Sequence, residues 1–185
     1  MKASAWCLAM ASVLAAGSAL AADLKSGPQP GDDVGAFQVE KVAGAVNDNV
    51  EPGKHLCYRC MLGSKPVVMV FARNADPSLA MLIKGLDKQV ADNSDKKLSS
   101  FVNLLGKDTD ALKVQGKELA TKNVAVVVPE DNENGPADYN INPKADVTVL
   151  IYRNGKVEAN HALAAGKLDK TEVDAILSDT KKILE

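Results

Sequence analysis

Continuous apolar runs of strand length recur along the chain and predict a sheet. Residues 66–72 form one such run, as expected for a central strand that is covered on both faces. Residues 98–105, 124–128 and 147–152 predict three further strands. A weaker alternation of apolar and polar positions over 37–42 predicts a strand before them. The chain is therefore expected to fold around a largely buried sheet.

Amphipathic segments fill the intervals between these runs and predict helices. Asp76 and Pro77 open the first helix, because Asp is a favoured cap and Pro is favoured at the first helical position. A second helix is expected over 108–123, and the last begins at Asp169, with Glu172 three residues on. The first helix carries one apolar stripe, which consists of Leu79, Leu82, Ile83, Leu86 and Val90.

The dipeptide Asn154-Gly155 predicts a tight hairpin between 147–152 and 156–163. A hairpin adds an antiparallel pair, whereas the strand–helix–strand order before it places the earlier strands parallel through right-handed crossovers. Residues 55–61 are expected to form a strand or a turn, with no helix start. The prediction is a mixed α/β sheet that is flanked by helices and extended by an N-terminal β-hairpin.

The first 22 residues have the pattern of a secretory signal peptide. Lys2 supplies a positive start, residues 3–20 are almost wholly apolar or small, and Ala21 and Ala22 suit signal peptidase. A retained membrane anchor is the alternative, but Ala, Ser and Gly dilute the stretch and no charged flank follows closely. We expect cleavage, an extracytoplasmic location (periplasmic or secreted), and no stable membrane insertion afterwards.

The remainder has the size and composition of one domain. Cleavage after residue 22 of the 185 leaves 163, enough for one core and too few for two. Residues 23–33 are polar and rich in Gly and Pro, which predicts a flexible leader, and 34–185 are expected to form the domain. Loss of Lys2 changes the net charge from −2 to −3, and there is no Lys/Arg cluster, so a nucleic-acid partner is not expected.

The element order resembles that of the thioredoxin superfamily. The resemblance is carried by the run Val-Thr-Val-Leu-Ile-Tyr-Arg-Asn-Gly-Lys-Val at 147–157 and the helix after it. The insertion before the hairpin, with Gly31-Asp32 and Phe37 near the start, is most similar to the peroxiredoxin and membrane-anchored thioredoxin-like branches. The resemblance covers about residues 31–184 and implies a three-layer α/β/α fold with a mixed central sheet.

The place of the family's redox cysteines holds no cysteine in this sequence. In thioredoxins a Cys-x-x-Cys follows the first central strand, at a helix start that stabilises the thiolate. Here that loop is 73–78, Arg-Asn-Ala-Asp-Pro-Ser, and a peroxidatic cysteine would belong to the same loop. The family's cis-proline would align near Asp146-Val147, and Pro143 is a few residues early. Ordinary thioredoxin or peroxiredoxin activity at that place is therefore not expected.

Cys57 and Cys60, which precede the first central strand, are the candidate catalytic pair. Their spacing can hold a reducible disulfide, an oxidising compartment permits one, and Arg59 beside both thiols would favour the thiolate. Residues three apart in an extended strand have Cα atoms about 10 Å apart, beyond the roughly 7 Å limit for a disulfide. A bond between them therefore requires a turn at Tyr58-Arg59.

Two other interpretations of the pair remain open. The disulfide could be a structural staple that tightens the N-terminal hairpin. Alternatively, His55, Cys57 and Cys60 form a His-x-Cys-x-x-Cys cluster, and thiolates with imidazole suit zinc or cuprous copper, with Met61 and His161 as further candidate ligands. A disulfide in either role is favoured over a metal, and no cofactor is predicted.

The sequence thus predicts an exported thioredoxin-fold protein with thiol–disulfide redox activity through a displaced pair. Its partners would be exported protein thiols or disulfides. The alternative is a non-catalytic binding or structural module of the same fold. Asp131, Glu133 and Asp138 crowd an irregular loop, where a solvated acidic turn is favoured over a calcium site.

Overall fold

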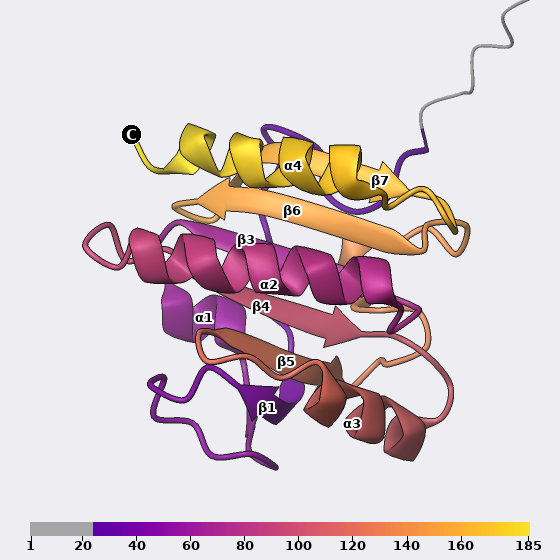
Figure 1. The fold of residues 1–185 in the computed structure, drawn as a ribbon. Coiled ribbons are helices and arrows are strands. Elements are labelled where there is room, and N and C mark those ends of the chain that lie inside the picture. Colours follow the sequence, from indigo (N-terminus) through magenta and orange to yellow (C-terminus); the bar gives the residue numbers. More distant parts are fainter. Residues whose placement is uncertain (1–23) are drawn as a thin grey trace, which may run out of the picture.

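The computed structural model describes residues 24–185, which form a seven-stranded sheet covered on both faces (Figure 1). The strand order across the sheet is β2-β1-β5-β4-β3-β6-β7. The predicted signal peptide lies outside the described residues. The strands are β1 (Val39–Gly44), β2 (His55–Leu56), β3 (Val67–Ala72), β4 (Ser99–Leu104), β5 (Val124–Pro129), β6 (Val147–Arg153) and β7 (Lys156–Leu163).

The strand directions follow from the connections. β3, β4 and β5 are mutually parallel and joined by helices, whereas β6 runs antiparallel to β3 and β7 antiparallel to β6. Asn154 and Gly155 have φ values of 56° and 77°, the left-handed pair that a two-residue hairpin turn requires. At the other edge, β2 and β1 form an antiparallel pair against β5. The predicted mixed sheet and both hairpins are confirmed.

Helices cover one face of the sheet, and a shorter layer covers the other. Figure 1 shows α2, α3 and α4 in front of the sheet and α1 behind it, in agreement with the two buried clusters. The predicted three-layer α/β/α fold is therefore confirmed. Within residues 24–185, none of the helices combines the length and the apolar content needed to span a bilayer. The helices are α1 (Tyr58–Leu62), α2 (Pro77–Asp92), α3 (Thr109–Glu118) and α4 (Lys170–Asp179), with 3-10 turns η1 (Ala137–Tyr139) and η2 (Thr180–Ile183).

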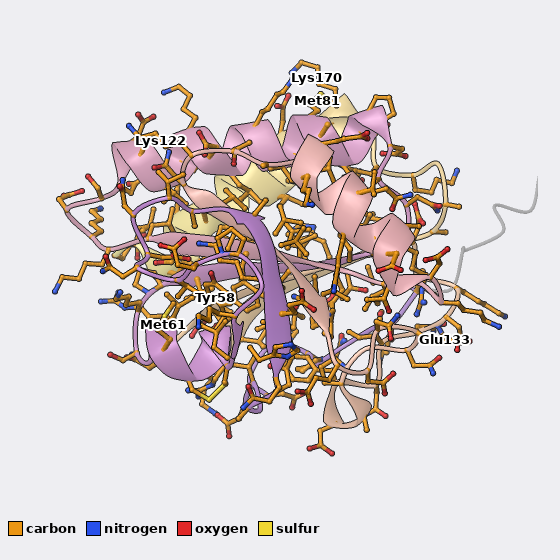
Figure 2. All side chains as sticks on the ribbon, turned by 90° about the horizontal axis from the view of Figure 1, so that it is seen from below. Tyr58, Met61, Met81, Lys122, Glu133 and Lys170 are labelled. Atoms are coloured by element: carbon orange, nitrogen blue, oxygen red, sulfur yellow. A yellow bond between two sulfur atoms is a disulfide. The ribbon has the colours of Figure 1, made fainter. Side chains whose placement is uncertain are left out.

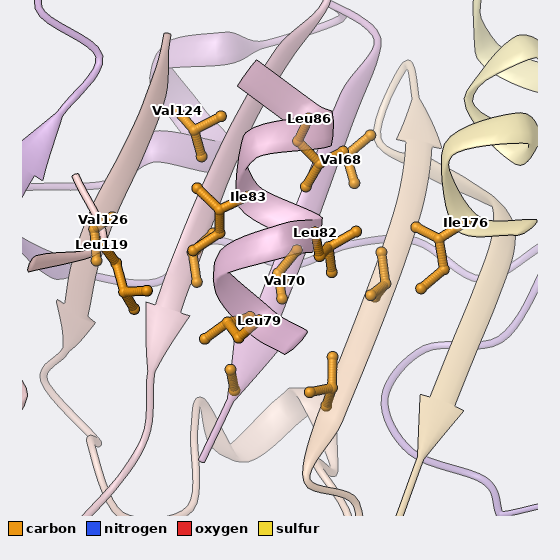
Figure 3. Close-up of a cluster of buried hydrophobic side chains, with 14 of the residues drawn as sticks. Val68, Val70, Leu79, Leu82, Ile83, Leu86, Leu119, Val124, Val126 and Ile176 are labelled. Carbon is orange, nitrogen blue, oxygen red and sulfur yellow. The ribbon is translucent and has the colours of Figure 1, made fainter. Parts of the chain in front are cut away.

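α2 packs on the centre of the sheet, as its apolar stripe predicts (Figure 3). The carboxylate of Asp76 caps the helix, since its Oδ1 accepts a hydrogen bond from the backbone N–H of Leu79 at 2.8 Å. Val68 and Val70 of β3 belong to the same cluster. Burial of four leucine-sized side chains contributes about 1.5–3 kcal/mol each. These four are Leu79, Leu82, Ile83 and Leu86.

Aromatic side chains fill the opposite face, beneath α1. Tyr58 of α1 stacks on Phe101 of β4, with ring centroids 5.4 Å apart. Tyr139 of η1 lies edge-on to Phe37 at 5.1 Å and 5.5 Å from Phe71 of β3. Offset and edge-to-face contacts of this kind add to the burial of apolar surface. The position of α1 on the sheet therefore depends on Tyr58.

Residues 24–34 lie against the β6–β7 hairpin. Ser26 is buried, and its hydroxyl shares a hydrogen bond of 2.6 Å with that of Thr148 in β6. The side-chain amide of Asn160 in β7 donates to the Ser26 carbonyl oxygen at 2.8 Å. The expectation of a flexible leader over 23–33 rested on low apolar content. Hydrogen bonds, which leave little periodic trace in a sequence, hold this segment to the domain instead.

The close approach of β1 to β5 can be tested at Gly44. Its φ is +77°, and a Cβ there would overlap the backbone carbonyl oxygen of Val124. Gly44→Ala is expected to lower the free energy of unfolding by about 3 kcal/mol or more, because strain in the left-handed region and overpacking add. The matched control is Gly53→Ala, with φ +85° and open space around the added methyl group. The control should cost about 1–2 kcal/mol. Urea unfolding measures both, and equal losses would contradict the proposed close approach.

Candidate functional site

A disulfide joins Cys57 and Cys60 at the start of α1. The two Cα atoms lie 5.2 Å apart, within the range that a disulfide spans. Cys57 is the N-cap residue, and its sulfur accepts a hydrogen bond from the backbone N–H of Cys60 at 3.0 Å. The turn that the bond requires at Tyr58-Arg59 is the first turn of this helix.

The expectation that no helix begins within 55–61 is wrong. β2 ends at Leu56 after two residues, and α1 starts at Tyr58. Five helical residues are too few to show a helical period, and Cys is not among the residues favoured as caps. The sulfur of Cys57 takes the capping role that a side-chain oxygen usually has.

The disulfide is accessible from solvent. Cys60 is exposed and Cys57 is half-buried. Figure 2 shows the sulfur–sulfur bond at the outer side of the short helix. If the bond is reduced, the N–H of Cys60 can donate to a thiolate on Cys57, and such charge-assisted hydrogen bonds are stronger than neutral ones. The better leaving sulfur is therefore Cys57, and the more accessible one is Cys60.

Arg59, which was expected beside both thiols, binds elsewhere. Its Nε donates to the backbone carbonyl oxygen of Val34 at 3.0 Å. Its guanidinium lies so close to Gly155 that a Cβ there would collide with it. Arg59 therefore ties α1 to the β6–β7 turn and to the N-terminal segment. The group that contacts the capping sulfur is the amide of Cys60.

A buried polar network beneath α1 was not predicted from the sequence. Lys41 of β1 is only 2% exposed, and its ammonium donates to Asp48 Oδ1 and to the Val50 carbonyl oxygen at 2.7 Å each, and to that of Ala45 at 3.2 Å. The other oxygen of Asp48 accepts a hydrogen bond of 2.5 Å from the Tyr58 hydroxyl. The loop between β1 and β2 is thereby fixed to the helix that carries the disulfide.

A cleft of about 330 Å³ opens beside α1. Met61 and Leu62 of α1 form one wall, and the β1–β2 loop around Asp48 forms another. A smaller recess of about 70 Å³ shares part of this lining and reaches Tyr58. Figure 2 shows Lys122, which also lines the cleft, on the same side of the molecule as Met61.

The candidate metal ligands do not converge. Cys57 and Cys60 are bonded to each other, and His55 is 59% exposed with its two ring nitrogens 3.8 Å from carboxylates of Glu40 and Glu130. His161 belongs to β7, which is at the opposite edge of the sheet from β2, and its Nε2 lies 3.1 Å from Oδ2 of Asp179. Among residues 24–185, no three His, Cys, Asp or Glu side chains are placed to hold a metal ion, the 131–138 loop included.

The loop where the family has its cysteines has a structural role here. Asp76 caps α2, and Asn74 donates to Asp146 at 2.5 Å. Arg73 donates to the carbonyl oxygens of Glu133 at 2.8 Å and Ala145 at 3.2 Å. These contacts join the end of β3 to the segment that precedes β6. The described residues contain no cis peptide bond, so Pro143 does not supply one.

The network predicts opposite effects for two buried tyrosines. Tyr58→Phe removes a hydrogen bond to a carboxylate and should lower the free energy of unfolding by about 1.5–3 kcal/mol. Tyr152 is fully buried in β6, and its hydroxyl has no partner among residues 24–185. Tyr152→Phe is the matched control and should be neutral or stabilising, because an unpaired buried hydroxyl carries a desolvation cost. Chemical denaturation of both variants distinguishes them, and an equal loss would contradict this role of Asp48.

Alkaline pH should unfold the protein through its three tyrosines. Burial raises the pKa of Tyr58, Tyr139 and Tyr152 above the usual 10.0, and the hydrogen bond to Asp48 raises that of Tyr58 further. Above pH 10 the unfolded chain releases these protons while the native state keeps them, so stability falls as pH rises. Each tyrosine contributes up to about 1.4 kcal/mol per pH unit. Tyrosinate absorbance should therefore rise together with loss of circular dichroism, and ionisation of a folded protein near pH 10 would contradict this.

Comparison with known proteins supports the fold and little else. No protein-family model matches the chain, and no curated protein matches its sequence. Several solved structures do match. A candidate thiol:disulfide interchange protein DsbE of Chlorobium tepidum has a TM-score of 0.63 at 15% identity, over 85% of this chain and 99% of that one.

Two further matches belong to other branches of the same fold. Mycobacterium tuberculosis AhpC matches with a TM-score of 0.59 at 15% identity, over 85% of this chain and 99% of its own. The exposed lipoprotein thioredoxin Etrx1 of Streptococcus pneumoniae matches with a TM-score of 0.54 at 18% identity, over 80% and 99%. The chain therefore has the thioredoxin-like fold, with a disulfide-bonded cysteine pair at the start of α1.

Proposed function

We propose that this protein is an exported thiol–disulfide oxidoreductase that works through Cys57 and Cys60. The observation that carries the proposal is the solvent-accessible disulfide, in which the half-buried sulfur of Cys57 accepts a hydrogen bond from the backbone N–H of Cys60. A disulfide that is accessible on one side and has a stabilised leaving thiolate on the other suits exchange chemistry. Export is proposed from the signal-like pattern of residues 1–22, which also makes exported protein thiols or disulfides the partners.

The exchange follows from the exposure of the two sulfurs. A substrate thiolate attacks the sulfur of Cys60, the Cys57–Cys60 bond breaks, and Cys57 leaves as a thiolate that accepts the N–H of Cys60. A second substrate thiolate then attacks the substrate sulfur of the mixed disulfide and releases Cys60. The substrate's two thiols become a disulfide, the protein's disulfide becomes two cysteines, and the two substrate protons pass to solvent or to the cysteines. The reverse sequence reduces a substrate disulfide.

A structural staple is the second candidate function for the pair. The side chains between the two cysteines favour this function, because Tyr58 and Arg59 both hold α1 to the domain through hydrogen bonds. A disulfide across the same turn would make this attachment more rigid. The reduction potential separates the two functions, because structural disulfides typically lie below about −300 mV.

The test combines the reduction potential with the trapping of intermediates. For the oxidoreductase we expect a potential above about −300 mV in glutathione or dithiothreitol buffers, and catalysis of insulin reduction. Cys60→Ser should abolish both catalysis and trapping, because the accessible sulfur is lost. Cys57→Ser should abolish turnover but accumulate a mixed disulfide on Cys60, detectable by mass spectrometry.

Circular dichroism of both serine variants is the control for folding. A potential below about −300 mV, with no reductase activity and no trapped intermediate, would leave the staple as the function. Stoichiometric zinc or copper that is lost in His55→Ala would instead support the metal site and exclude both.

A further inference from the structure

We propose that the cleft beside α1 receives an extended acidic segment of a partner protein and presents that segment's cysteine or disulfide to Cys60. This inference rests on the proposed oxidoreductase function and adds the substrate class. The cleft volume of about 330 Å³ lies within the range of ligand pockets. Its lining comes from α1, the β1–β2 loop, the end of α2, the start of β4 and the two residues before β5.

The charge of the cleft is positive although the whole chain is acidic. Lys65 and Lys122 line it, both are exposed, and within residues 24–185 neither forms an ion pair with a carboxylate. Asp48 is the acidic residue of the lining, and its charge is already matched by Lys41 and by the Tyr58 hydroxyl. The remaining polar lining is uncharged. Two uncompensated ammonium groups in a concave surface attract carboxylates and steer their approach.

Exposed apolar side chains gather at the same place. Among the described residues, four large hydrophobic side chains are exposed, and two of them adjoin this cleft. Met61 lines it and is 41% exposed, and Val46, which is 66% exposed, stands between the lining residues Ala45 and Asn47. Methionine adapts to varied apolar partners. The favoured ligand therefore combines carboxylates with an apolar side chain.

The reactive sulfur belongs to the residue next to the cleft along α1, although Cys60 itself is not one of the lining residues. Cys60 directly precedes Met61 in α1, so their Cα atoms are about 3.8 Å apart, and Cys60 is exposed. Consecutive residues of a helix point about 100° apart, so the sulfur of Cys60 lies around α1 from the wall that Met61 forms, and an extended segment reaches it by continuing past Met61. The β1–β2 wall cannot move away freely, because Lys41 and Tyr58 hold Asp48 between them. The cleft is thus preformed on one flank of the helix that carries the disulfide.

The test compares two peptides in exchange with the reduced full-length protein. In one, glutamates flank a Val-Cys pair whose cysteine is disulfide-linked to 2-mercaptoethanol, and in the other the glutamates are glutamines. At low ionic strength the acidic peptide should exchange about ten-fold faster. The preference should disappear at about 1 M salt. It should also disappear in Lys65→Gln/Lys122→Gln, but persist in the control Lys144→Gln/Lys167→Gln, whose exposed lysines lie outside the cleft.

Two readouts separate this inference from the proposed function. Equal exchange rates for both peptides would overturn the acidic-segment inference and leave the oxidoreductase intact. Binding of cysteine-free peptides, with serine in place of cysteine, is measured by calorimetry whether or not exchange occurs. Charge-dependent binding without exchange would support the cleft and overturn the oxidoreductase. Absence of charge-dependent binding and of exchange would overturn both.

Discussion

The arrangement of the candidate site depends on one buried ion pair, between Lys41 and Asp48. An ammonium group that is almost completely removed from water is costly unless every proton finds an acceptor. Lys41 meets this requirement with a carboxylate oxygen and two carbonyl oxygens, all from the loop that follows its own strand. The loop must therefore fold back over β1, and this brings Asp48 under the Tyr58 hydroxyl. One wall of the cleft and the attachment of Tyr58, the first residue of α1, follow from this contact.

The fold separates its scaffold from its candidate chemistry. The end of β3, where related folds place their cysteines, is occupied by Arg73 and Asp76, which hold the loop and cap α2. The cysteines instead lie before β3, on a helix that rests on the aromatic layer of the other face. A sheet with two covered faces offers helix starts on both sides. Its stability therefore does not require that thiol chemistry occupy the usual end of β3.

The sequence predicted the elements that bury apolar surface periodically. Each of these elements leaves a local pattern that could be recognised. They include the strand at 66–72, the apolar stripe from Leu79 to Leu86 and the Asn154-Gly155 turn. Two features of the site left none. α1 is too short for a period and is capped by sulfur, and Lys41 is a lone charge in a weak strand whose partner lies across a loop. The sequence could locate the cysteines, but it could not show what surrounds them.

The capping role of Cys57 bears on what reduction would do to α1. The N–H of Cys60 can donate to the Cys57 sulfur whether that sulfur is in a disulfide or a thiolate, and the buried side chains of Tyr58 and Leu62 are anchored independently of it. Opening the bond therefore removes a covalent tie but not the contacts that position the helix. A site built in this way can change its redox state with little rearrangement of the cleft beside it. A disulfide whose only contribution was to hold a loop in place would not have this property.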